Sequence, residues 1–401
     1  MIALIGLFPK NRTPFLLSLL AIFITLPVLV FGPIAGVLVD RWHKKNVMVI
    51  CDALRMLCAL AIPLVFALTH NIYPVFALVF AMFLLALFFN TARSAIIPNL
   101  VAKKRILAAN SVINLIGRGA TFLGMLLGGV IIDWRWWKAA LGIDGWAAAF
   151  IIDALTFAIS AVMLYVMKVD LAFRKVEETH LQARGLYLLI YNGLRKIIHD
   201  LLDAVKSIIK IRDLLFAICT IFLMIIAGSV IYVLVIPIVQ QEMAWGTSGV
   251  GILASVGAIG LLVGAYLTGI AGHHYDLKMT MLVCFVVIGG VLIAFPFLNN
   301  FYVFCLLCLI GGIAISPVFI GQDTLIHRSA DELIRGRIFS LREWILNGSF
   351  ALVALIIGSV ATFVSRRLLF VFFGAIVILG AAFGAIAINR GKSSAVPSNS
   401  H

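Results

Sequence analysis

The feature that most constrains this chain is a series of apolar stretches, each about 20 residues long, that recurs along almost its whole length. A helix of about 20 mostly apolar residues spans the hydrocarbon core of a lipid bilayer. Short polar turns such as Asn299–Asn300 separate the stretches. We therefore predict an all-α integral membrane protein with about eleven spans, at residues 14–38, 46–68, 73–98, 107–132, 145–167, 214–239, 247–271, 278–298, 301–322, 340–364 and 368–389.

The composition excludes a water-soluble domain. The chain is 63% hydrophobic and 12% charged, with a mean hydropathy of +1.14, whereas soluble domains carry about 25% charged residues. The net charge of +14 would suit a nucleic-acid partner, but the basic residues lie in short loops between the apolar stretches, as membrane topology signals do. We expect contact with membrane lipid, no nucleic-acid partner and a monomer.

Enzyme and metal signatures are missing from the sequence. All six cysteines lie inside apolar stretches, and no second pair or histidine accompanies Cys305 and Cys308, so free thiols are predicted and a metal site is not. The chain has no Walker loop, no nucleophile elbow and no metal-ligand cluster. We therefore predict no enzyme activity and no cofactor, and this chain by itself cannot drive transport with ATP.

The loops predict an orientation and a division into parts. About 22 of the 31 Lys and Arg residues fall in one alternating set of loops, which the positive-inside rule places in the cytosol together with the C-terminus. Met1 is then outside. The predicted parts are an N-terminal bundle at 1–167, a cytosolic linker at 168–213, a C-terminal six-helix bundle at 214–389 and a tail at 390–401. Within the linker, residues 184–213 have the spacing of an amphipathic helix on the membrane surface, or alternatively of a helix for a regulatory partner.

An internal repeat is indicated by a shift of roughly 229 residues, which brings Gly32 and Gly36 near Gly260 and Gly264. The same shift matches Met1–Pro9 with the end of the span at 214–239. This predicts that Met1–Pro9 is the outer end of a first helix, most of which is missing from the N-terminal bundle. A mis-assigned start codon and a genuine loss both remain open.

The turn after the first complete span carries a motif. Gly36, Asp40, Arg41, Lys44 and Lys45 follow one another in a short basic turn; the glycine permits close helix approach, the aspartate can accept hydrogen bonds from a helix N-terminus, and the bases suit anionic lipid. The motif resembles the signature loop of the major facilitator superfamily, with His43 where that family usually has glycine. The resemblance implies a two-bundle fold of twelve helices that alternates access through a central cavity.

Other features resemble the macrolide-efflux and enterobactin-exporter-like permeases of that superfamily. They are the pair Asp52 and Arg55, the run Phe88–Ala95 and the run Arg335–Leu341. The resemblance implies export of a small molecule, often in exchange for protons. The antiporter pattern of the fifth helix is weaker, because Ala120 and Met125 replace its first glycine and its proline.

Intramembrane charges supply the candidate site, because ionisable side chains are costly in lipid. Asp52 and Arg55, three residues apart on one helix face, and Arg93 are predicted at similar depth, either as a structural latch or with Asp52 carrying protons. Arg118 and Asp153 fall near the midplane, where they either pair or line a cavity that binds an anionic substrate. Gln322, Asp323 and Glu343 are candidate counterparts in the second half.

The leading hypothesis is a proton-coupled exporter of a small, amphipathic molecule in a bacterial cytoplasmic membrane. Uptake of a metabolite is the alternative that Met125 favours. A degenerate, non-transporting membrane protein is the alternative that the incomplete first helix favours.

Overall fold

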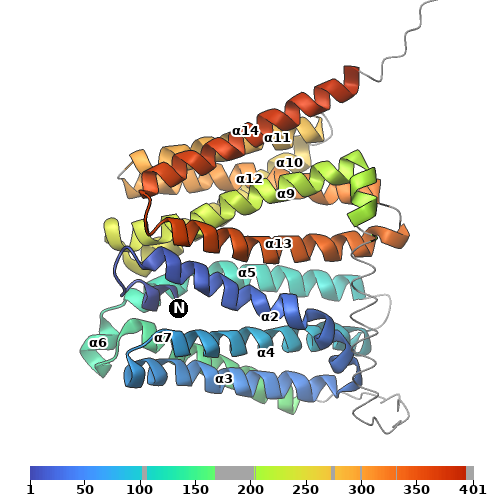
Figure 1. The fold of residues 1–401 in the computed structure, drawn as a ribbon. Helices are drawn as coiled ribbons and strands as arrows, with labels where there is room; N and C mark the ends of the chain where they lie inside the picture. The colour runs from blue at the N-terminus through green and yellow to red at the C-terminus, as the bar shows by residue number, and fades with distance from the viewer. Residues whose placement is uncertain are drawn as a thin grey trace, which may run out of the picture. The chain divides into compact units, whose positions relative to one another are not determined.

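The computed structural model describes residues 1–101, 106–167, 203, 205–271, 276–298, 300–330 and 332–393. These residues form helices joined by short turns (Figure 1). Ten helices in this part of the chain are long and apolar enough to cross a membrane, and the predicted span at 107–132 corresponds to a further helix with an apolar stretch at Gly119–Asp133. The predicted all-α membrane fold with about eleven spans is confirmed. Residues 168–202 of the predicted linker lie outside the described residues.

The chain forms two compact units. The first contains Met1 and residues 19–202, and the second contains residues 2–18 and 203–401. Residues 2–18, predicted as part of the N-terminal bundle, thus belong to the compact unit of the C-terminal half.

In the first unit, α3 packs along both α4 and α7, and α5 contacts α7. The short helix α6 was not predicted. The rings of its first two residues, Trp136 and Trp137, and of Trp134 just before it contact one another. Tryptophan gathers at membrane–water interfaces. The helices are α2 (Thr13–Arg41, from Leu19 in this unit), α3 (Lys44–Thr69), α4 (Tyr73–Leu100), α5 (Ile106–Asp133), α6 (Trp136–Leu141) and α7 (Gly145–Val166).

In the second unit, α10 packs on α12, α11 packs on α12 and α14, and α9 contacts α12, α13 and α14. Its elements are α1 (Ile2–Ile5), α9 (Arg212–Val230), η2 (Ile231–Val235), η3 (Ile238–Glu242), α10 (Gly246–Ala271), α11 (Leu277–Ala294), η4 (Phe295–Phe297), α12 (Phe301–Ser329), α13 (Glu332–Val360) and α14 (Arg366–Ser393).

The chain continues from α9 as the π-helices η2 and η3, which lie on either side of Pro237. Proline has no N–H, and its ring clashes with the carbonyl four residues earlier in a regular α-helix. A wider π turn removes that clash while the chain continues as a helix.

Three glycines bring α10 and α12 together. A Cβ atom on Gly260 would lie 2.4 Å from the carbonyl oxygen of Leu309, and one on Gly264 would lie 2.4 Å from that of Ile313. A Cβ on Gly312 would meet the carbonyl of Gly257 at 2.3 Å. Only residues without a side chain allow this backbone approach, which is typical of small-residue crossings between membrane helices.

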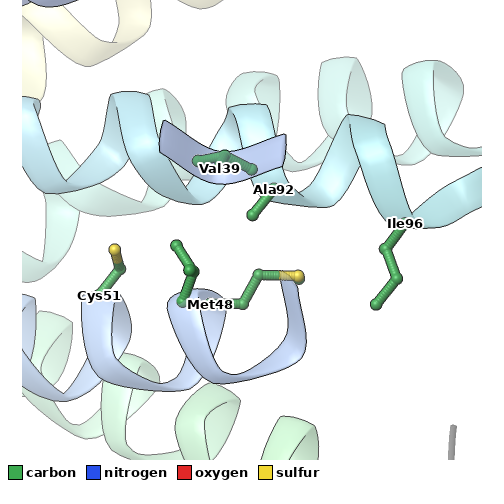
Figure 2. Packing of buried hydrophobic residues seen from close by; sticks show 6 residues of the cluster. Val39, Met48, Cys51, Ala92 and Ile96 are labelled. Carbon is green, nitrogen blue, oxygen red and sulfur yellow. The ribbon is translucent and has the colours of Figure 1, made fainter. Parts of the chain in front are cut away.

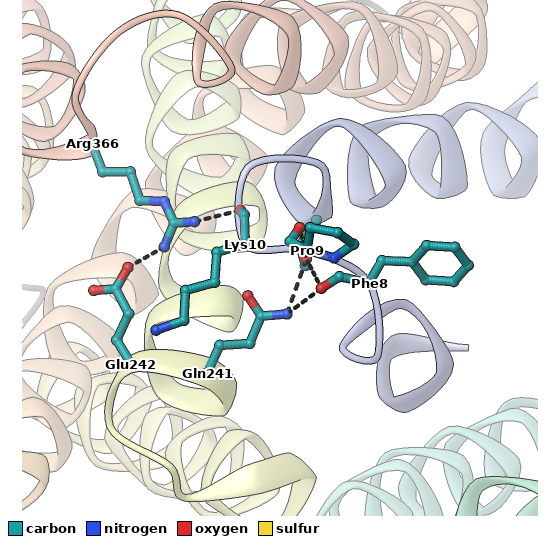
Figure 3. Close-up of polar contacts among 7 residues, drawn as sticks. Phe8, Pro9, Lys10, Gln241, Glu242 and Arg366 are labelled. Carbon is teal, nitrogen blue, oxygen red and sulfur yellow. Dashed lines mark hydrogen bonds and ion pairs between the residues drawn. The ribbon is translucent and has the colours of Figure 1, made fainter.

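The N-terminal segment is fastened to the second unit by polar contacts, shown in Figure 3. The side-chain amide of Gln241 lies 2.9 Å from the carbonyl of Gly6, 3.0 Å from that of Phe8 and 3.0 Å from the hydroxyl of Thr13. Arg366 donates to the carbonyl of Lys10 and to Glu242. The end of η3 and the start of α14 thus hold the segment that precedes α2.

Candidate functional site

The centre of the candidate site is an ion pair inside the first unit. Asp52 and Arg55 lie on adjacent turns of α3, and Arg55 Nη1 is 3.3 Å from Asp52 Oδ1. Asp52 is only 1% exposed. At about 1.5 Å per residue, its Cα lies roughly 12 Å along α3 from Lys44. A charged carboxylate at this depth needs partners, because burying an unpaired charge is costly.

A second helix supplies another partner, which the sequence did not reveal. Ser160 of α7 donates its hydroxyl to Asp52 Oδ2 at 2.5 Å. Each carboxylate oxygen of Asp52 therefore has a partner, one on its own helix and one on α7. A change in the charge of Asp52 would weaken both contacts at once.

Aromatic rings hold the guanidinium of Arg55. It stands 4.1 Å from the ring centroid of Phe157 on α7 and 6.0 Å from that of Phe89 on α4. A cation over an aromatic face is attracted by about 0.5–2 kcal/mol, with the larger values where water is excluded. Asp52 and Arg55 thus connect α3, α4 and α7.

A compact apolar cluster lies beside the pair of Asp52 and Arg55, towards the end of the unit where the loop joins α2 to α3. Val39 comes from the last turns of α2, Met48 and Cys51 from α3, and Ala92 and Ile96 from α4 (Figure 2). These side chains are at most 5% exposed. Cys51 precedes Asp52 directly, so apolar packing bounds the pair on this side, and low polarity strengthens its electrostatic attraction.

The signature loop joins α2 and α3 without a glycine. Gly36, Asp40 and Arg41 belong to the end of α2, and α3 starts at Lys44. His43 has φ −67° and ψ 103°, which is extended backbone open to any residue, so the departure from the family pattern costs no strain. Lys45 donates to the carbonyl of Tyr165 at the end of α7, at 2.8 Å.

The predicted role of Gly36 in close helix approach has no counterpart in the described residues, because no atom lies within 4 Å of a Cβ placed on it. The side chain of Asp40 lies outside the described residues.

The other predicted charges are more dispersed. Arg93 lies on α4 with an exposed side chain, and the side chain of Arg118 on α5 lies outside the described residues. Asp153, Phe157 and Ser160 are spaced four and three residues apart, so they share one face of α7. Arg55 contacts Phe157 on that face.

The second unit has its own polar contacts. Arg342 of α13 lies 3.1 Å from Asp323 of α12 and 3.5 Å from Glu343. Gln322, 1% exposed, donates to the hydroxyl of Thr220 on α9 at 3.3 Å. The structure therefore gives each of the three predicted counterparts a partner. Within the run Arg335–Leu341, the side chains of residues 335–337 and of Ser340 lie outside the described residues.

Comparison with known proteins identifies the family. The chain matches the family model of the Major Facilitator Superfamily over residues 10–246 and 216–400, and it therefore belongs to that superfamily. Its members are transporters rather than enzymes. Together with the membrane-spanning helices, this makes the chain a multi-pass membrane protein.

Two similar curated proteins, YfiS and YfmI, come from Bacillus subtilis (strain 168), where they are described as uncharacterised MFS-type transporters. YfiS is 28% identical over 168 residues, which are 42% of this chain and 37% of YfiS. YfmI is 23% identical over 312 residues, which are 74% of this chain and 68% of YfmI. The chain thus matches well under half of the length of YfiS.

Solved structures agree in fold. A peptide transporter POT superposes with a TM-score of 0.70 at 13% identity, covering 96% of this chain and 87% of the other. The nucleoside transporter NupG gives 0.65 at 13% identity, covering 96% and 95%. A bacterial homologue of the lysosomal transporter Spinster, facing inward and unoccupied, gives 0.64 at 12% identity, covering 96% of both chains. At such identities the likeness concerns the fold alone.

Proposed function

We propose that this chain is a secondary transporter that exports a small, amphipathic molecule across a bacterial cytoplasmic membrane in exchange for protons. Membership of the superfamily supports transport by alternating access. The observation that carries the proton coupling is the Asp52 carboxylate, buried in a membrane helix and bonded to both α3 and α7. The basic loops support a cytosolic C-terminus.

In this proposal Asp52 and Arg55 form a latch. The charged carboxylate holds Arg55 on its own helix and Ser160 on α7, at the end of the unit predicted to face the cytosol. Protonation would remove the charge, weaken both contacts and let α7 shift against α3. The signature loop is adjacent, because Lys45 contacts the end of the same helix α7.

Direct proton carriage by Asp52 is the second reading of the same geometry. In that case the proton on Asp52 is the transported ion. The two readings differ in what remains when the carboxylate is replaced by an amide of the same shape. A carrier without its proton site still exchanges substrate across the membrane without net proton movement. A transporter without its latch loses control of the conformational change, so exchange and driven transport fall together.

Inverted membrane vesicles from bacteria that produce the protein provide the test, with ethidium as a fluorescent amphipathic probe. Respiration acidifies the vesicle interior, and we expect ethidium to accumulate there until the gradient is collapsed with nigericin and valinomycin. For the Asp52→Asn variant, a latch predicts that both driven accumulation and ethidium exchange fall. Retained exchange with lost accumulation would assign Asp52 to proton carriage. Asp144→Asn, an exposed aspartate of the same unit, is the matched control.

Metabolite uptake is the competing direction. It is favoured by Met125, which stands in α5 where antiporters of the superfamily have a helix-softening proline. If proton-coupled uptake were the activity, ethidium would not accumulate in inverted vesicles whose interior respiration makes acidic. The varied substrates named for the solved relatives, peptides and nucleosides among them, leave the substrate to experiment.

A further inference from the structure

A cavity of about 1370 Å³ lies inside the second unit, among α9, α10, α11, α12 and α14. Its lining residues come from the first turns of α9 and α11 and from the last turns of α10, α12 and α14. The cavity therefore opens at the end of the unit that the basic loops predict to be cytosolic.

The inner wall of this cavity is mainly apolar, with Thr220 and Thr324 as its polar residues. Phe216 and Leu223 of α9, Leu282 of α11, and Phe383 and Ile386 of α14 line it. From Arg212 to Leu223 the wall follows α9 for about 16 Å, at 1.5 Å per residue. A channel of this depth, walled mainly by apolar side chains and set among membrane helices, suits an acyl chain rather than a small polar ion.

Three basic side chains lie at the mouth of the cavity, and they differ in whether an acidic side chain neutralises them. Lys278 is neutralised by Asp213, whose carboxylate is 2.6 Å away, and Asp276 accepts from the first backbone N–H groups of α11. Arg212 and Arg328 are exposed at the mouth, and neither has an ion-pair partner among the described residues. Two guanidinium groups are thus left to bind an anion from outside the chain, and guanidinium binds phosphate oxygens in a forked geometry.

We propose that this cavity binds an anionic phospholipid, with Arg212 and Arg328 on the headgroup phosphate and an acyl chain along the apolar wall. Basic pockets between membrane helices on the cytoplasmic side bind such headgroups. The site lies entirely within one unit and is independent of the proposed substrate and of the proton coupling at Asp52. A bound lipid would fill the space between α9 and α14 and steady the start of α9.

Cys219 provides a direct readout, because it lines the cavity and is exposed. In a variant that keeps Cys219 as its only cysteine, the rate of N-ethylmaleimide labelling is measured in dodecyl maltoside micelles with added lipid. Dioleoylphosphatidylglycerol is expected to slow labelling, and dioleoylphosphatidylcholine to do so far less. Arg212→Gln with Arg328→Gln should raise the phosphatidylglycerol concentration needed by about thirtyfold, from about 1 kcal/mol for each basic side chain.

The matched control is Lys206→Gln with Lys210→Gln, which removes the same charge near the same end of the unit but outside the cavity. It should leave protection by phosphatidylglycerol unchanged. If the double arginine variant does not fold, each single variant replaces it, with a shift of about fivefold. Equal protection by both lipids, or protection by inorganic phosphate alone, would overturn the proposal. So would slow labelling without any lipid, since another segment of the chain would then cover the cavity.

Discussion

At the scale of single residues, the account depends on how the Asp52 carboxylate is accommodated in a membrane helix. Its two oxygens have separate partners, Arg55 on α3 and Ser160 on α7. Breaking a buried pair on one side leaves an uncompensated charge, which costs about 3–5 kcal/mol in soluble proteins. Water defects and snorkelling make the cost smaller in membranes.

We expect Asp52→Asn to lower the melting temperature of the detergent-solubilised protein, because the half-buried Arg55 then lacks its carboxylate partner. Adding Arg55→Gln should restore part of the lost stability, because the effects of substituting two residues in contact do not add. Ser160→Ala should cost about 1.5–3 kcal/mol, the range for a hydrogen bond to a charged group. Thr156→Ala, which removes an exposed hydroxyl from the same helix, should have almost no effect. Additive losses in the Asp52 and Arg55 double variant would contradict the pairing.

The sequence predicted the pair of Asp52 and Arg55 but not the residues of α7 that contact it. The spacing of Asp52 and Arg55 places them on one helix face, and both lie within an apolar stretch, so a pair could be foreseen. Ser160 and Phe157 could not, because serine and phenylalanine are ordinary in membrane helices and which turns of α3 and α7 meet is decided by tertiary packing. The same holds for Thr220 and Arg342, whose partners lie on other helices.

At the scale of helices, the glycines that the predicted repeat makes equivalent are packed differently in the two halves of the chain. Gly32 and Gly36 of α2 have no atom within 4 Å of an added Cβ among the described residues, whereas Gly260 and Gly264 of α10 meet the backbone of α12. A glycine pattern therefore indicates that a close approach is allowed, and the partner helix decides whether it occurs. The π-helices η2 and η3 also depended on context, since Pro237 predicts a disturbance of the helix but not its form.

Gly260→Ala should destabilise the protein by about 1–3 kcal/mol, since overpacking against fixed backbone cannot relax. Gly290→Ala in α11 is the matched control, because nothing lies within 4 Å of its added Cβ. That substitution should be neutral or raise stability by up to about 1 kcal/mol through helix propensity. Melting temperatures of the two variants in the same detergent give the comparison. Equal effects would show that the α10–α12 crossing is looser than described.

The contacts of Gln241 predict a local change rather than a global one. Gln241→Ala removes the amide that reaches Gly6, Phe8 and Thr13, so amide hydrogen exchange across residues 6–13 should accelerate while the rest of the second unit stays protected. Asn347→Ala removes an exposed amide that donates to the carbonyl of Glu343 within α13 instead, and it should leave this exchange unchanged. Unaltered exchange in the Gln241 variant would mean that other contacts hold the segment.

At the scale of the whole molecule, hydropathy predicted the helices and the loop charges predicted an orientation. The helices are predictable because a bilayer sets the length of every span and requires the N–H and C=O groups of its backbone to be hydrogen-bonded within the protein. The sequence divided the chain at the linker, but residues 2–18 form part of the second unit. The reason is local: Gln241, Glu242 and Arg366 bind this segment, and a short stretch before a helix carries no sign of such contacts.

The predicted orientation is tested with cysteines at the two ends of α3. In a variant without native cysteines, Asn46→Cys should resist an impermeant maleimide in intact cells and react in inverted vesicles. Asn71→Cys, exposed at the opposite end of the helix, should show the reverse. If Asn46→Cys reacts in intact cells and Asn71→Cys does not, the topology is inverted and the charge count of the loops is misleading.

The measurement that tests the central claim most directly uses the purified protein in liposomes with an imposed pH gradient. With an acidic interior, we expect ethidium or Hoechst 33342 added outside to accumulate inside as protons leave, and the accumulation to vanish when nigericin removes the gradient. Protein-free liposomes set the background. Accumulation of either dye only with an alkaline interior would indicate symport and contradict proton-coupled export. So would equal movement with and without the gradient.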